Sequence, residues 1–188
     1  LHPRVRRQRQ MCIRDSVYVL PNNKNIVMAA EQAARLARTS GVRRIHVVPT
    51  TTIPQGISAM MAYDESAEIK DNVEAMQEAA SRVQSGSVTF AARDSDYDGH
   101  QIKEGELLAL ENGKVAFTGT DLGSVTAKVA KDLMQEDSQF ITLLYGADVS
   151  EEQAADVEEA VRSLLPEEVE LTVAYGGQPV YYFLISVE

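Results

Sequence analysis

Near the start of the chain, a short apolar run is followed by a segment in which apolar residues recur at helical spacing. Val17–Leu20 is a short apolar run rich in β-forming residues, and Pro21 closes it. A polar loop follows, and from Ile26 to Ala37 the apolar side chains recur at helical spacing. This pattern predicts a strand, a loop and an amphipathic helix, which together form the elementary unit of an α/β sheet. Because such sheets carry their sites at the carboxyl ends of strands, the loop is the first place where we expect a site.

The pattern continues to residue 84. A second strand is predicted over Arg43–Pro49, followed by a polar segment over 50–56 and a short apolar helix over 57–62. A longer helix is marked by an apolar stripe that consists of Ile69, Val73, Met76, Ala80 and Val83. Gln84–Gly86 breaks this stripe, so we place the boundary between two lobes there.

In the second half of the chain, the sequence pattern predicts more strands than helices. Asn112-Gly113 lies between two apolar runs and predicts a tight hairpin, because both residues tolerate positive φ. Helices are predicted from Asp121 to Met134 and from a capping box at Ser150–Gln153. The segment 180–187 is apolar throughout, as in strands buried on both faces. The order of elements predicts an α/β fold of two lobes: a partial parallel α/β lobe over residues 17–84, then a mixed or antiparallel α+β lobe over residues 85–188.

Residues 1–16 differ from the rest of the chain. They contain five arginines, one aspartate and the only cysteine, Cys12, and they show no periodicity. Their ending, MCIRDS, resembles translated sequencing-adapter sequence found in metagenomic reading frames. We therefore expect residues 1–16 to be a non-native or artefactual tail joined to a truncated protein.

Charge and composition narrow the function classes. Without residues 1–16 the chain keeps 18 − 5 = 13 basic and 28 − 1 = 27 acidic residues, a formal charge of −14, which disfavours a nucleic-acid partner. No apolar run approaches the ~20 residues of a membrane span. The single cysteine excludes a CxxC site, and the histidines at positions 2, 46 and 100 lack metal-ligand spacing. We expect a cytoplasmic chain that binds no nucleic acid, spans no membrane and holds no metal.

Three polar segments at the ends of predicted strands are candidate binding sites for a partner or ligand. Their residues are Asn22, Asn23, Lys24 and Asn25 in the first, Thr51, Thr52, Gln55 and Gly56 in the second, and Gly176, Gly177 and Gln178 in the third. Helix N-termini favour anions, and glycine lets a ligand approach the backbone closely. The alternative for each segment is that it only caps helices and forms turns. No nucleophile–base pair is present, so no catalytic residue is predicted.

Two further motifs have both a chemical and a structural interpretation. His46 lies inside a predicted strand, where a packed histidine is favoured over a reactive one. Asp94, Asp96 and Asp98 resemble the start of a calcium loop, but Gly105 stands where that motif needs its twelfth-position glutamate. A solvated acidic turn is the favoured interpretation.

Five segments, in order along the chain, resemble one known family. LPNNKNIVMAAEQA at 20–33, PTTTIPQGISAM at 49–60 and YGGQPVYYFLISVE at 175–188 are similar to the C-terminal region of the bacterial fatty acid kinase A-subunit. EGELLALENGKVAFTGTDL at 104–122 and YGADVSEEQA at 145–154 are similar to it as well. This is the YloV-type family, which has a dihydroxyacetone-kinase-like N-terminal domain. The resemblance covers residues 17–188 and implies a DegV-like fold.

The resemblance implies a role within a longer parent protein. In that family an N-terminal domain binds ATP and magnesium, and the C-terminal region engages a DegV-type fatty-acid-binding protein whose bound fatty acid is phosphorylated. The chain is therefore expected to be a non-catalytic fragment, truncated at its N-terminus, that docks the acyl-loaded carrier and needs no cofactor itself. A homodimer formed through the parent is a further expectation.

Two other functions stay open. A small-ligand or acyl-binding module of DegV-like fold needs an apolar tunnel with a hydroxyl at its mouth, which Thr50, Thr51 or Thr52 could supply. An autonomous phosphotransferase needs clustered carboxylates for magnesium beside a phosphate loop. The acidic cluster at 94–98 has no such loop beside it.

Overall fold

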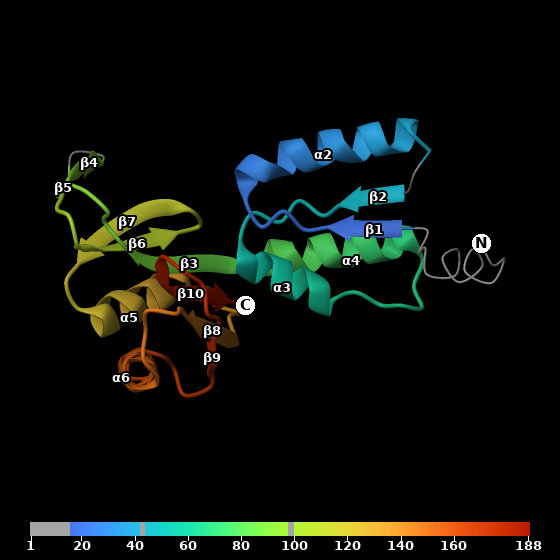
Figure 1. Ribbon diagram of the computed structural model, residues 1–188. Helices are drawn as coiled ribbons and strands as arrows, with labels where there is room; N and C mark the ends of the chain where they lie inside the picture. Colours follow the sequence, from blue (N-terminus) through green and yellow to red (C-terminus); the bar gives the residue numbers. More distant parts are fainter. Residues whose placement is uncertain (1–15, 42–43, 98–99) are drawn as a thin grey trace, which may run out of the picture. The chain divides into compact units, whose positions relative to one another are not determined.

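The computed structural model describes residues 16–41, 44–97 and 100–188 (Figure 1). Apart from Ser16, the predicted artefactual tail lies outside the described residues, and so does Asp98. The chain divides into two compact units, Leu1–Ser81 and Arg82–Glu188. The predicted boundary after residue 84 thus lies three residues beyond the observed one.

Unit 1 begins with the predicted strand, helix and strand. β1 (Ser16–Val19) and β2 (Arg44–Val47) pair in parallel, and α2 (Lys24–Thr39) connects them (Figure 1). Asn23 caps α2 because its side chain accepts a hydrogen bond from the Asn25 N–H. Gly41 follows the helix with φ +68°, a conformation for which glycine is favoured after the end of a helix. The parallel α/β character predicted for this lobe is confirmed.

Two further helices complete unit 1. α3 (Ile53–Met61) begins four residues before the helix predicted over 57–62, because Thr52 caps it and Pro54 fits its first turn. α4 (Ile69–Arg82) follows the predicted stripe. The buried core is small and consists of Val48, Ala59, Met76 and Ala80, with Tyr18 and Leu20 packed against it.

Unit 2 contains a six-stranded mixed sheet. Its strands are β3 (Gln84–Phe90), β6 (Leu107–Glu111), β7 (Lys114–Gly119), β8 (Phe140–Tyr145), β9 (Glu170–Tyr175) and β10 (Tyr181–Val187). Their spatial order is β7-β6-β3-β10-β8-β9, with β8 and β9 parallel and all other neighbours antiparallel. The mixed α+β lobe is confirmed, and β10 lies in the interior of the sheet as its continuous apolar run predicts.

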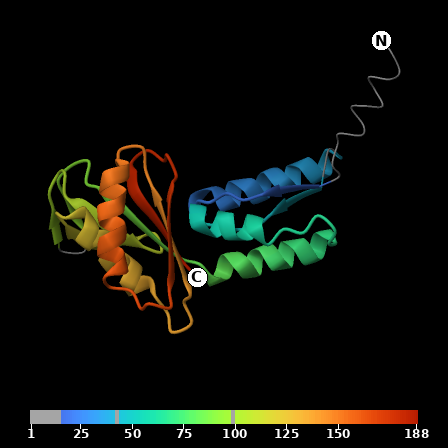
Figure 2. The ribbon, with the colours of Figure 1, turned by 90° about the horizontal axis from the view of Figure 1, so that it is seen from below.

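Two helices cover one face of this sheet. α5 (Leu122–Leu133) and α6 (Glu151–Arg162) contact each other and contribute to one continuous core with the sheet (Figure 2). Asp121 caps α5, and Ser150 with Gln153 forms the predicted capping box of α6. The hairpin between β6 and β7 turns at Asn112 and Gly113, whose φ values are +48° and +78°. These local predictions are confirmed.

The acidic stretch after β3, predicted to be a solvated turn, keeps Asp94 and Asp96 exposed and includes a short hairpin. β4 (Ser95–Tyr97) and β5 (His100–Ile102) form a small antiparallel hairpin there. Asp94 Oδ1 accepts a hydrogen bond from the Glu104 N–H at 2.7 Å, so this carboxylate closes the base of the hairpin. The elements flanking the stretch are strands, whereas the calcium motif requires helices.

The helical stripe ends before Gln84–Gly86, as predicted, since α4 ends at Arg82 and β3 begins at Gln84. A Cβ on Gly86 would lie 2.5 Å from Val129 Cγ1 and 2.8 Å from Leu133 Cδ1. Glycine therefore stands inside the strand because α5 packs directly against the backbone at this point, and not because the chain turns.

No helix among the described residues combines the length and the apolar character that a membrane crossing requires.

Candidate functional site

The predicted site residues fall into two groups, one in each unit. The loops that hold Asn22–Asn25 and 51–56 lie together at the carboxyl ends of β1 and β2, as expected for neighbouring parallel strands. The turn at 176–178 joins β9 to β10 in unit 2. We describe the two groups separately.

A hydrogen-bonded pair joins the two loops of unit 1. The Thr50 hydroxyl donates to Asn22 Oδ1 at 2.8 Å and accepts from the Asn22 N–H at 3.3 Å. Asn22 has φ +53°, a left-handed conformation that asparagine tolerates better than most residues. Thr50 is fully buried, so its hydroxyl is used to hold the loops together. The docking site predicted from the sequence includes Thr51 and Thr52 of the threonine run 50–52 but not Thr50, the residue that joins the two loops.

Gly56 belongs to the same cluster. A Cβ at this position would lie 2.1 Å from Asn22 Oδ1, so only glycine leaves space for the Asn22 side chain. The predicted role of Gly56 in a close approach is therefore explained by a contact within the protein.

The remaining polar side chains of these loops bond to nearby groups. Gln55 Oε1 accepts from both the N–H and the hydroxyl of Thr51, each at 2.8 Å. Thr52 accepts from the Gln55 N–H as the cap of α3. Lys24 is exposed at the first residue of α2. The loops of unit 1 thus contain the predicted caps and loop contacts, and a role of these loops in binding stays a prediction.

Replacing Thr50 with valine is expected to lower the free energy of unfolding by about 1–2 kcal/mol. Valine has nearly the same shape but leaves the Asn22 N–H and Oδ1 without their partner. Urea denaturation followed by circular dichroism measures the change. Thr51→Val is the matched control, because Thr51 is exposed and Gln55 keeps its hydrogen bond from the Thr51 N–H. Equal losses in the two variants would contradict a special role of the Asn22–Thr50 pair.

The glycine turn of unit 2 is fixed by hydrogen bonds to β8. The N–H groups of Gly176 and Gly177 donate to Tyr145 O at 2.9 and 3.3 Å. Gln178 Nε2 donates to Leu144 O at 2.7 Å, and Gln178 O accepts from the Ala147 N–H at 3.0 Å. The side chain and backbone of Gln178 therefore attach the turn to the neighbouring strand and loop.

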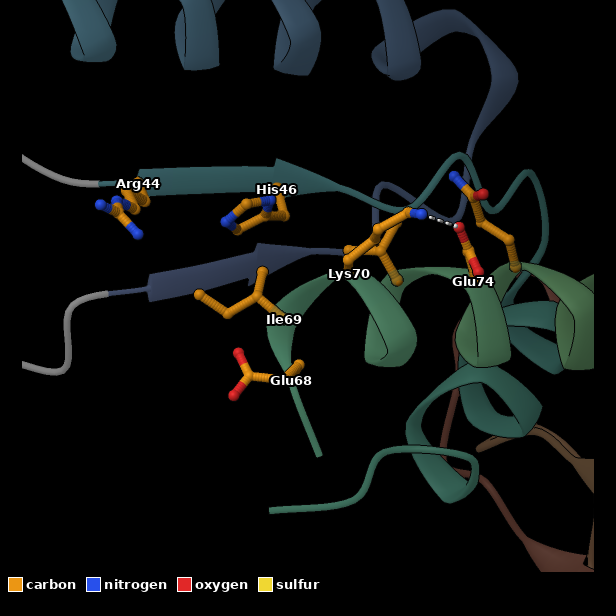
Figure 3. A pocket seen from close by; sticks show the side chains of 8 residues that line it. Arg44, His46, Glu68, Ile69, Lys70 and Glu74 are labelled. Carbon is orange, nitrogen blue, oxygen red and sulfur yellow. Dashed lines mark ion pairs between the residues drawn. The ribbon is translucent and has the colours of Figure 1, made fainter. Parts of the chain in front are cut away.

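A pocket of about 570 Å³ lies beside β2 in unit 1 (Figure 3). Arg44 and His46 of β2 line it together with Glu68, which precedes α4, and with Ile69, Lys70, Val73, Glu74 and Gln77 of α4. Lys70 forms an exposed ion pair with Glu74 at 3.5 Å, which contributes little to stability. His46 Nε2 is buried and has no hydrogen-bond partner among the described residues.

The surroundings of His46 disfavour its charged form. Burial lowers the pKa of His46 below its ordinary value of 6.5, and the positive charges of Arg38 and Arg44 lower it further. The Tyr18 ring lies 5.7 Å from the imidazole, on the paired strand. The histidine is therefore neutral at pH 7 and packs against an aromatic neighbour, as the favoured interpretation predicts.

Acidification is expected to destabilise the chain through His46. Because the folded-state pKa is the lower one, the unfolded chain binds a proton first as the pH falls through 6.5. The stability is therefore complete above that value and declines toward the lower folded-state pKa. We expect the unfolding free energy of His46→Gln to change less with pH, between about pH 7.5 and 5, than that of the unchanged chain. Denaturation curves of both proteins at several pH values measure the pH dependence of this free energy. Because the other two histidines are present in both proteins, their contribution cancels in the comparison. An equal pH dependence of the two proteins would contradict the prediction.

Among the described residues, no group of three or more His, Cys, Asp and Glu side chains is arranged to hold a metal ion. The two described carboxylates of the calcium-like stretch are Asp94 and Asp96. Asp94 is already used in the hydrogen bond to the Glu104 backbone. The calcium interpretation gains no support from this geometry.

Comparison with known sequences gives a family and a length. A family model of the C-terminal region of FakA-like proteins, in which FakA is the fatty acid kinase A-subunit, matches residues 10–188. Protein YloV of Bacillus subtilis is 38% identical over 174 residues, which cover 93% of this chain and 31% of YloV. An uncharacterized protein of Staphylococcus haemolyticus is 41% identical over 170 residues, which cover 90% of this chain and 30% of that protein. The chain thus spans about a third of the length of these curated relatives.

Comparison with solved structures identifies the fold. The fatty acid kinase B3 protein of Streptococcus pneumoniae, loaded with linoleic acid, matches with a TM-score of 0.61 and 12% identity over 96% of this chain and 74% of that chain. The DegV family protein Cg2579 of Corynebacterium glutamicum matches with a TM-score of 0.62 and 15% identity over 97% and 77%. The dihydroxyacetone kinase of C. freundii matches with a TM-score of 0.67 and 14% identity over 90% and 38%. These likenesses confirm the predicted DegV-like fold.

Proposed function

This chain belongs to the family of FakA-like C-terminal domains of fatty acid kinases, and from that premise we propose that it is a non-catalytic docking domain. It binds an acyl-loaded DegV-type carrier protein and positions the carrier for a kinase domain elsewhere in the parent, which phosphorylates the fatty acid with ATP. The family match over residues 10–188 carries this proposal. Since the chain spans about a third of its relatives, the proposal concerns one part of a larger protein.

The geometry of the candidate loops supports a binding role over a chemical one. Thr50, Gln55 and Gln178 use their polar groups in hydrogen bonds within the fold. Such side chains give the loops a fixed shape, which a docking surface needs to limit the entropy lost on binding. We further propose that ATP and magnesium are held by the parent's N-terminal domain, that the parent acts in the cytoplasm in bacterial lipid metabolism, and that any homodimer forms through the parent.

Direct binding of a fatty acid is the second candidate function. The DegV-like fold favours it, because the similar Streptococcus pneumoniae protein is described as loaded with linoleic acid. An acyl chain would need space between the sheet and helices of unit 2. At Gly86 the side chains of Val129 and Leu133 approach the sheet so closely that a single Cβ would overlap them. This close packing supports docking as the first proposal.

Calorimetric titration separates the two functions. The 188-residue chain is titrated with an oleate-loaded DegV-type carrier from the same organism, with free oleate, and with ATP–magnesium. We expect heat from the carrier alone. Heat from free oleate without a response to the carrier would replace docking by acyl binding, and heat from ATP–magnesium would overturn the assignment of the nucleotide to the parent's other domain.

A further inference from the structure

The turn between β9 and β10 exposes three large side chains in seven residues. Tyr175 is 64% exposed, Val180 54% and Tyr181 38%. In β10, which follows the turn, Phe183, Ile185 and Val187 are by contrast almost completely buried. Tyrosine is among the residue types that dominate binding energy at protein interfaces.

The Tyr175 side chain is held in a fixed position although it is exposed. Its ring lies 5.3 Å from the Tyr145 ring, centroid to centroid. A Cβ on Gly177 would lie 3.3 Å from three atoms of the Tyr175 side chain, so the ring lies close against the glycine backbone. The hydrogen bonds of Gly176 and Gly177 to Tyr145 O hold that backbone in place. A supported ring loses little rotamer entropy when a partner covers it.

Val180 adds backbone strain at the same turn. Its φ is +74°, a left-handed conformation that is an outlier for a β-branched residue. The Tyr181 N–H donates to Pro179 O at 2.8 Å, and the Thr89 hydroxyl donates to Val180 O at 2.7 Å, so the surrounding structure imposes this conformation. Glycine would remove the strain, and the valine side chain is half exposed. An imposed outlier with an exposed apolar side chain indicates a function outside the core.

An acidic segment begins beside this turn. The Ala147 N–H donates to Gln178 O at 3.0 Å, and the exposed Asp148, Glu151 and Glu152 follow it. Residues 148–170 contain nine acidic residues and one arginine. The partner surface should therefore present an apolar centre with basic residues on the side that faces this segment.

Resting on the proposed function, we infer that Tyr175, Val180 and Tyr181, with Asp148, Glu151 and Glu152 at the rim, form the surface on which the DegV-type carrier docks. The rim charge disfavours two other occupants, a membrane and a second copy of this chain, that exposed tyrosines would also suit. An anionic membrane would be repelled by the carboxylates, and a second copy of this chain would bring two acidic rims together. The predicted residues Gly176, Gly177 and Gln178 then act as the rigid support of the contact side chains.

Titration of variants of the full chain with the oleate-loaded carrier tests this surface. Tyr175→Ser is expected to weaken binding by about tenfold or more. Val180→Gly is expected to weaken binding about threefold while the melting temperature stays equal or rises, because glycine fits the positive φ. Asp148→Lys is expected to slow association, with a smaller effect in high salt.

Matched controls come from the opposite end of the unit 2 sheet. Phe140 is 50% exposed at the start of β8, whereas Tyr145 ends that strand. Glu136 is exposed in the segment between α5 and β8, close in sequence to Phe140. Phe140→Ala and Glu136→Lys should therefore leave the affinity unchanged. If the unchanged chain does not bind the carrier, the proposed function fails. If it binds but only the controls weaken binding, or if all variants bind equally, the function stands and the surface assignment is wrong. Binding of the chain to phosphatidylglycerol vesicles that is lost in Tyr175→Ser would also overturn it.

Discussion

Replacing Phe183 with alanine is expected to lower the free energy of unfolding of unit 2 by about 3–5 kcal/mol. Phe183 is completely buried in β10, which is paired with β3 on one side and β8 on the other. The truncation removes a large apolar side chain from the core and leaves a cavity. The cavity cannot collapse fully, because β10 is held in place by its pairing with β3 and β8. Urea denaturation followed by circular dichroism gives the loss, and hydrogen exchange assigns it to unit 2.

Phe140→Ala is the matched control for this prediction. It makes the same chemical change in the same sheet, at a side chain that is 50% exposed. We expect a change within about 0.5 kcal/mol, as for most surface positions. A loss in Phe183→Ala no larger than in Phe140→Ala would contradict the central position of β10 in the core.

Replacing Gly86 with valine is expected to cost about 3 kcal/mol, the upper part of the range for overpacking. The first added carbon would already lie 2.5 Å from Val129 Cγ1 and 3.3 Å from Ile185 Cβ. Because Val129 and Ile185 are fully buried, they have no solvent to move into. The same denaturation measurement gives the effect, and a stabilised variant would show that valine's preference for strands outweighs the overlap.

A double-mutant cycle identifies the cause. Val129→Ala removes the atom that an alanine at position 86 would meet first. The double variant Gly86→Ala, Val129→Ala should therefore be more stable than the sum of the two single losses predicts, by about 0.5–3 kcal/mol. Additive losses would show that the glycine is needed for its backbone and not for space.

Local signals in the sequence are enough for most of the secondary structure. Asn112 and Gly113 form the predicted hairpin, and Ser150 and Gln153 form the predicted capping box. The capping box joins groups that are three residues apart, and the hairpin turn depends on the positive φ of two adjacent residues, so the local sequence is enough to predict both. The family is predictable as well, because it depends on the order of sequence segments and not on geometry.

The candidate sites show where local signals end. The sequence predicts sites in the polar loops after β1 and β2, but the residue that joins these loops is Thr50, whose partner Asn22 is 28 residues away. A run of three threonines does not reveal which hydroxyl is buried, since burial depends on the position of the neighbouring loop. The exposed Tyr175 and the strained Val180 escape sequence reasoning for the same cause, because the sequence shows only a turn between two strands.

The helices, the tight turns, the two-lobe α/β character and the family follow from the sequence, since they depend on neighbouring side chains or on the order of segments. Contacts between distant segments, by contrast, place Gly86 inside a strand and hold Val180 at φ +74°. They also leave Tyr175 exposed over Gly177. These features arise from contacts between distant segments, whose packing selects one conformation from several that the local sequence allows.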